Sequence, residues 1–146
     1  MSVCTFLASD VPLEEWRPSQ DDPLCVNLDG SADDCFFSYP FSEVRTYTSK
    51  PFGVVLSWNG SERSARKIME YIKMAIQKAD SIELWHVWLT DYYEFEDRPF
   101  LHQKVLAFSQ LSPAHLQALE DAEIWNTPDK QYPNRPSFYC LTITRE

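Results

Sequence analysis

The sequence predicts an α+β domain whose core, residues 52–146, follows the β-α-β-β-α-β order of a ferredoxin-like fold. Two observations favour this class. Apolar residues recur at helical spacing between positions 65 and 79, and segments rich in β-branched and aromatic residues alternate with helical ones. The length of 146 residues fits one domain, residues 1–146. An N-terminal strand and a long irregular acidic segment, together residues 1–51, are expected to precede the core.

The N-terminal part combines one clear strand with a proline-rich stretch. Residues 3–9 are apolar and β-branched enough to predict a strand. Five prolines interrupt residues 12–51, so that stretch is expected to be irregular. Its many aromatic residues indicate that it packs on the body of the domain. Residues 24–28 and 44–48 are expected to form short edge strands within it.

The second half of the chain gives the core of the predicted fold. Its expected elements are a strand at 52–58, a helix at 61–79, strands at 82–89 and 104–109, a helix at 112–122 and a strand at 138–144. The first helix carries an apolar stripe that includes Ile68, Ile72 and Ile76, which we expect to be buried. Both helices are expected on one face of an antiparallel sheet, with the N-terminal strand added to it.

The chain is strongly acidic, and this charge excludes some partners. It has 22 Asp+Glu against 13 Lys+Arg, for a net charge of -9. Nucleic acid and anionic membrane surfaces are not expected partners, because both are bound largely through cations. The acids are concentrated, with nine acids and one base in residues 1–44 and five acids and no base in residues 81–97. Such stretches fit either an ordinary solvated surface or a face that attracts a basic protein.

Location, thiols and cofactors follow from what the sequence lacks. Residues 1–10 do not read as a signal peptide, and no run of 18 apolar residues occurs, so we expect a cytoplasmic protein. The three glycines of the chain do not form a Gly-rich dinucleotide-binding turn or phosphate loop. The three histidines are not spaced as metal ligands. No cofactor and no metal are therefore expected. In the cytoplasm four cysteines are expected to be free thiols, namely Cys4, Cys25, Cys35 and Cys140.

Residues 84–97 are the most unusual stretch, with two Trp, two Tyr, one His and four carboxylates. Strand alternation places Trp85 on one face of the sheet and His86 on the other. One face should meet the helices. The other is expected to be either an open aromatic platform or a surface covered by residues 12–51. The candidate binding residues here are Trp85, His86, Tyr92, Tyr93, Glu94 and Glu96, with the alternative that Trp85 and His86 are core residues.

A proline-rich connection, residues 123–136, is the second candidate. Its three prolines restrict the backbone and so lower the entropy lost on binding. Trp, Tyr and Arg are also the residue types that dominate interface energetics. The candidate binding residues are Trp125, Tyr132, Asn134 and Arg135. The alternative is a rigid loop that covers one end of the sheet with its aromatic side chains packed inward.

No catalytic motif accompanies these segments. No sequence pattern supplies a nucleophile that His86 would activate, and no carboxylate pair is fixed by its spacing. The favoured expectation is a small acidic cytoplasmic module that binds protein, such as an inhibitor or immunity-type protein for a basic enzyme. The alternative is a small-molecule-binding or enzymatic domain with its site between the aromatic sheet face and residues 125–136. The first requires an acidic surface, and the second requires a concave apolar pocket with converging polar groups.

Overall fold

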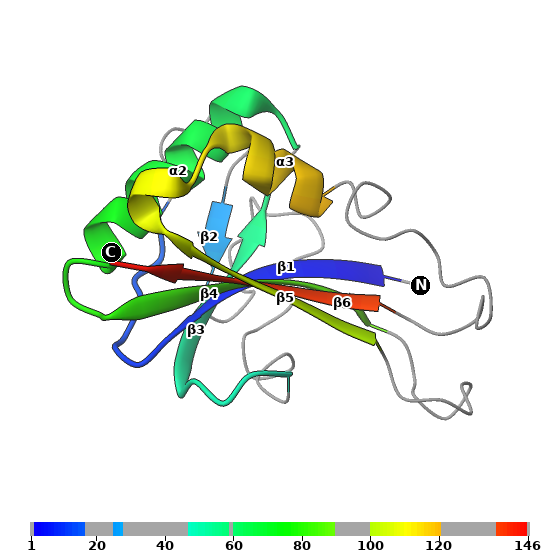
Figure 1. The fold of residues 1–146 in the computed structure, drawn as a ribbon, viewed down its shortest axis with the longest axis horizontal. Coiled ribbons are helices and arrows are strands. Elements are labelled where there is room, and N and C mark those ends of the chain that lie inside the picture. Colours follow the sequence, from blue (N-terminus) through cyan, green and yellow to red (C-terminus); the bar gives the residue numbers. More distant parts are fainter. Residues whose placement is uncertain are drawn as a thin grey trace.

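The computed structural model describes residues 2–16, 25–27, 47–58, 60–89, 100–120 and 137–145. Within them the chain forms one mixed sheet with two α-helices packed on the same face (Figure 1). The elements in chain order are β1 (Ser2–Ser9), β2 (Cys25–Asn27), β3 (Phe52–Ser57), α2 (Glu62–Ala75), β4 (Ser81–Leu89), β5 (Phe100–Ala107), a 3-10 turn (Phe108–Gln110), α3 (Pro113–Glu120) and β6 (Ser137–Thr144). The α+β class is thus confirmed, while the expected strand at 44–48 falls mostly outside the described residues.

The sheet order is β2-β3-β1-β4-β6-β5. All neighbours are antiparallel except β5 and β6, which are parallel. The expectation of an antiparallel, ferredoxin-like sheet is therefore not confirmed. The parallel pair has a simple cause: α3 lies between β5 and β6 in the chain and provides the crossover that parallel neighbours need.

The N-terminal strand joins the sheet, as the sequence predicts, and the structure gives its position, which the sequence prediction left open. β1 lies in the interior of the sheet and pairs with both β3 and β4. Its apolar side chains are buried on both faces, since Phe6 and Leu7 are each fully inaccessible. At an edge of the sheet, such a strand would expose more of its apolar side chains to water. The interior of the sheet is therefore its most favourable position.

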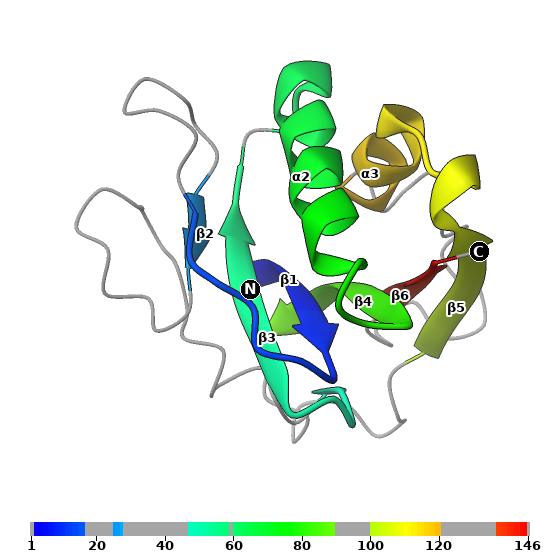
Figure 2. The same cartoon turned by 90° about the vertical axis from the view of Figure 1, so that its left-hand side faces the viewer.

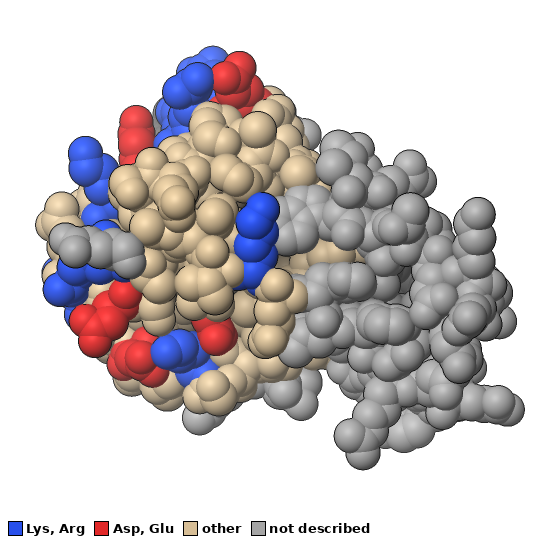
Figure 3. Space-filling view, in the orientation of Figure 1, with Lys and Arg blue, Asp and Glu red and all other residues tan. Residues whose placement is uncertain are grey.

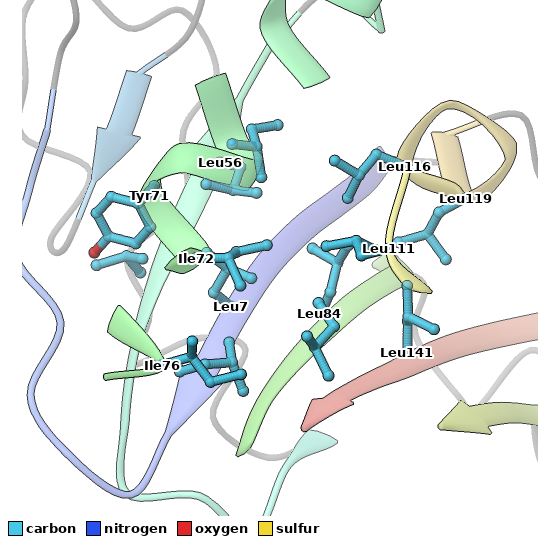
Figure 4. Close-up of a cluster of buried hydrophobic side chains, with 14 of the residues drawn as sticks. Leu7, Leu56, Tyr71, Ile72, Ile76, Leu84, Leu111, Leu116, Leu119 and Leu141 are labelled. Carbon is cyan, nitrogen blue, oxygen red and sulfur yellow. The ribbon is translucent and has the colours of Figure 1, made fainter. Parts of the chain in front are cut away.

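Helix α2 forms where the apolar spacing predicts it. The Ser61 hydroxyl accepts a hydrogen bond from the Ser64 N–H at 3.1 Å and caps the first turn. Ile68, Ile72 and Ile76 are only 1%, 0% and 5% exposed, which confirms the predicted buried stripe. These residues pack over the sheet beside α3, and Figure 4 shows Ile72 and Ile76 among leucines from the strands.

Helix α2 ends at Ala75, four residues before the predicted end. The guanidinium of Arg145, which follows β6, donates hydrogen bonds to the carbonyl oxygens of Ile76, Gln77 and Ala79, each at 3.1 Å. Its backbone N–H also donates to the carbonyl of Asp80. These contacts satisfy backbone carbonyls in the turn that follows the helix, where no intrahelical partner is present.

Two clusters of buried side chains lie on opposite faces of the sheet. The larger cluster lies under α2 and α3, which run side by side in Figure 2, and includes Leu84, Leu116 and Leu141. The smaller cluster lies on the other face, with Tyr47 packed against its edge. Its buried members are Phe6, Ala8, Val55, Trp85, Val87 and Cys140. Burial on both faces explains why β4 is apolar on both sides.

Candidate functional site

Trp85 is a core residue on the sheet face that points away from the helices. It is 5% exposed, and its ring stacks on Phe6 with the centroids 5.9 Å apart and the planes at 3°. Its indole N–H donates to the Glu83 carboxylate at 3.0 Å, and the Thr48 hydroxyl donates to the same oxygen. The sheet is thus covered at Trp85, and an open aromatic platform is not present at this residue.

His86 lies on the helix-facing side of β4 and is 2% exposed. Its Nδ1 is 2.9 Å from the Thr5 hydroxyl, and its ring contacts the Tyr139 ring at 6.3 Å between centroids. Burial lowers the pKa of His86 to about 4, so the imidazole is neutral near pH 7. His86 and Trp85 therefore lie on opposite faces of the sheet and do not share one binding surface. Both are core residues, which is the alternative that the sequence left open.

The other eight candidate residues lie outside the described part of the chain, so their predicted role stays a prediction. They are Tyr92, Tyr93, Glu94, Glu96, Trp125, Tyr132, Asn134 and Arg135.

The environments of Cys140 and His115 in the described residues fit structural roles. Cys140 is 1% exposed, and burial, together with the nearby Glu83 carboxylate, raises the pKa of its thiol to about 12. A buried, protonated thiol is a poor nucleophile. His115 accepts a hydrogen bond from the Ser112 N–H at 3.1 Å, at the start of α3. Among the described residues no three His, Cys, Asp or Glu side chains converge to hold a metal ion.

A groove of about 230 Å³ lies between residues 11–16 and the C-terminal half of α2. Residues 11–16 form one wall, with apolar side chains from Val11 to Trp16 and the carboxylates of Glu14 and Glu15. The opposite wall consists of Tyr71, Met74, Ala75, Gln77 and Lys78.

The two walls are fixed to each other by direct contacts. The Tyr71 hydroxyl donates to the Glu14 carbonyl oxygen at 2.6 Å. The Trp16 ring stacks on Tyr71 with centroids 6.0 Å apart. Trp16 also exchanges two backbone hydrogen bonds, of 3.1 and 2.8 Å, with Val26 of β2. Residues 11–16 are thereby held between α2 and the edge of the sheet, and the groove is preformed.

The sequence contained a signal for this groove that the periodicity argument did not use. Tyr71 and Met74 are three residues apart on the helix and lie off the buried apolar stripe. Tyr71 is 9% exposed because the N-terminal segment covers it, whereas Met74 is 71% exposed. A second apolar pair beside the main stripe indicates that something besides the sheet packs on that side of the helix.

Neither the described helices nor the comparisons add a further assignment. No helix in the described ranges has both the length and the apolarity needed to cross a membrane. No protein-family model, curated protein sequence or solved structure matches this chain.

Proposed function

We propose that this protein is a small acidic module that binds a basic protein, in the manner of an inhibitor or immunity-type protein for a basic enzyme. A cytoplasmic location, as the sequence suggests, is part of this proposal. The observation that carries it is the uneven distribution of acidic residues along the chain, with nine acids and one base in residues 1–44 and five acids and no base in residues 81–97.

The described residues carry eight Asp or Glu and eight Lys or Arg, so they are balanced. The whole chain has 22 Asp+Glu and 13 Lys+Arg, which leaves 14 acids and five bases on the other residues. Along the chain the acids are concentrated in two stretches, residues 1–44 and 81–97. The second stretch contains Glu94 and Glu96.

Some of the charged side chains in the described residues pair with one another. Lys50 pairs with Asp10 and Arg66 pairs with Glu62, each at 2.8 Å. Figure 3 shows basic and acidic side chains interspersed over the described part of the face it presents. Surplus like charge destabilises a compact protein by self-repulsion, so a net charge of -9 is not favoured by stability alone. A basic partner would give this charge a use, through faster and more selective association.

The groove between residues 11–16 and α2 is smaller than most sites for small molecules. Sites for drug-sized ligands and cofactors occupy about 300–1,000 Å³. The groove of about 230 Å³ is smaller and suits one or two side chains from another protein.

Affinity capture with charge variants tests this function. The tagged full chain, Glu94→Gln/Glu96→Gln and the control Glu70→Gln/Asp80→Asn are exposed to a native lysate at low and high salt. The two variants change the net charge equally, and Glu70 and Asp80 are exposed framework residues. We expect the wild type and the control to retain the same basic protein at low salt, and high salt to release it. The Glu94/Glu96 variant should lose it.

Equal retention by both double variants, or a partner whose recovery does not depend on salt, contradicts the proposal. Chemical denaturation of each variant confirms that the fold is unchanged, so that loss of the partner reports on binding alone.

A further inference from the structure

Met74 stands out on the described surface because it is a large apolar side chain bordering a cavity. It is 71% exposed, and the other large apolar side chains exposed in the described residues, Phe52 and Val105, do not line the groove. Methionine is flexible and polarizable, and it adapts to the shape of an incoming apolar group. Its exposure beside a concave apolar wall is typical of a contact surface.

The groove needs little reorganisation before it is occupied. Tyr71 is tied to the Glu14 carbonyl, and Trp16 is tied to both Tyr71 and Val26. Leu13 is 8% exposed and anchors the same segment in the core. Binding to such a preformed site does not have to overcome the entropy of ordering its walls.

The charge at the groove is polarised. Glu14 and Glu15 are exposed on one wall, and within the described residues neither takes part in an ion pair. Lys78 lies on the opposite wall. The carboxylates of Glu14 and Glu15 therefore favour a cationic group beside them, next to the apolar side chains of the groove.

We propose that this groove is an anchor site for a segment of a partner protein that carries a large apolar side chain next to Lys or Arg. The apolar side chain enters the cavity against Met74 and Trp16, and the basic side chain pairs with Glu14 or Glu15. This inference rests on the proposed function, since it names the contact made by the basic partner. It places that contact on the framework, away from Glu94 and Glu96 in sequence.

Amide NMR spectra of the full ¹⁵N-labelled chain, titrated with three capped peptides, test the site. The probe is Ac-KKLLKK-NH₂. The controls are Ac-KKSSKK-NH₂, which keeps the charge without the anchor, and Ac-EELLEE-NH₂, which keeps the anchor with the opposite charge. We expect the probe to shift amides in residues 11–16 and 71–78. Each control should bind at least about tenfold more weakly, because it lacks one of two favourable contacts.

Matched variants separate the groove from general attraction. Met74→Ser and Glu14→Gln/Glu15→Gln should each weaken the probe by about fivefold or more. Val105→Ser and Glu62→Gln/Glu70→Gln change the same chemistry at exposed positions off the groove and should bind like the wild type. Equal binding of the serine peptide and the leucine probe overturns the inference, and so does wild-type binding by Met74→Ser.

The result also separates this inference from the proposed function. Glu94→Gln/Glu96→Gln should keep the groove shifts with the probe, while losing the partner in affinity capture. If the probe leaves residues 11–16 and 71–78 unshifted but capture still depends on Glu94 and Glu96, the groove inference fails and the proposed function stands. If the groove binds the probe but capture is independent of Glu94 and Glu96, the proposed function fails.

Discussion

His86 occupies the helix-facing side of β4, where its neighbours are the Thr5 hydroxyl and the Tyr139 ring. A charged imidazole there would have to give up its hydration, which is why its pKa falls from 6.5 to about 4. By simple alternation, the sequence predicted that His86 and Trp85 lie on opposite faces of the sheet, without saying which of them faces the helices. It left open whether either residue was exposed, because exposure depends on what distant segments cover.

The low pKa of His86 predicts a specific loss of stability in acid. The unfolded state takes up a proton near pH 6.5 and the folded state near pH 4, so stability is present above 6.5 and is lost as the pH falls toward 4. Between pH 7 and pH 5 this amounts to about 2 kcal/mol. Urea denaturation of the wild type and His86→Gln at both pH values measures it. The variant should lose about 2 kcal/mol less than the wild type over this interval, whatever its stability at pH 7, and parallel losses would contradict the account.

At the scale of helices and strands, the sequence pattern predicted those features that depend on residues close together in the chain. The spacing of Ile68, Ile72 and Ile76 predicted a buried helix face, because apolar residues that recur every three to four positions lie on the same side of a helix. The end of α2 was predicted four residues too late, and the carbonyls that follow it are bonded by Arg145 from the far end of the sequence. The interior place of β1 and the groove between residues 11–16 and α2 were not predicted, because long-range pairing creates both.

Arg145 should therefore contribute measurably to stability although it is exposed. Arg145→Ala removes charge-assisted hydrogen bonds to the carbonyls of Ile76, Gln77 and Ala79. We expect a loss of about 1–3 kcal/mol in the free energy of unfolding. Arg63→Ala, an exposed arginine of α2, is the control and should change stability by less than about 0.5 kcal/mol. Chemical denaturation compares the two, and an equal effect would show that the Arg145 contacts do not stabilise the helix end.

At the scale of the whole molecule, a packed core of sheet and helices occurs in a strongly acidic chain. The sheet and helices bury two apolar clusters, and the acids of a chain with a net charge of -9 are concentrated in residues 1–44 and 81–97. The described residues also form a groove with exposed Met74 at its rim. Together these features support recognition of a basic protein, with long-range charge guiding the encounter and apolar contacts holding the complex.

The salt dependence of association with the captured partner tests this account most directly. Rate constants for the wild type, Glu94→Gln/Glu96→Gln and Trp125→Ala are measured by stopped-flow mixing across a range of salt. The account predicts a wild-type association rate that falls steeply as salt rises, because surface charges are screened beyond about 8–10 Å at physiological ionic strength. The Glu94/Glu96 variant should associate more slowly with a shallower salt dependence, and Trp125→Ala should mainly dissociate faster. An association rate that is independent of salt and unchanged in the Glu94/Glu96 variant would contradict it.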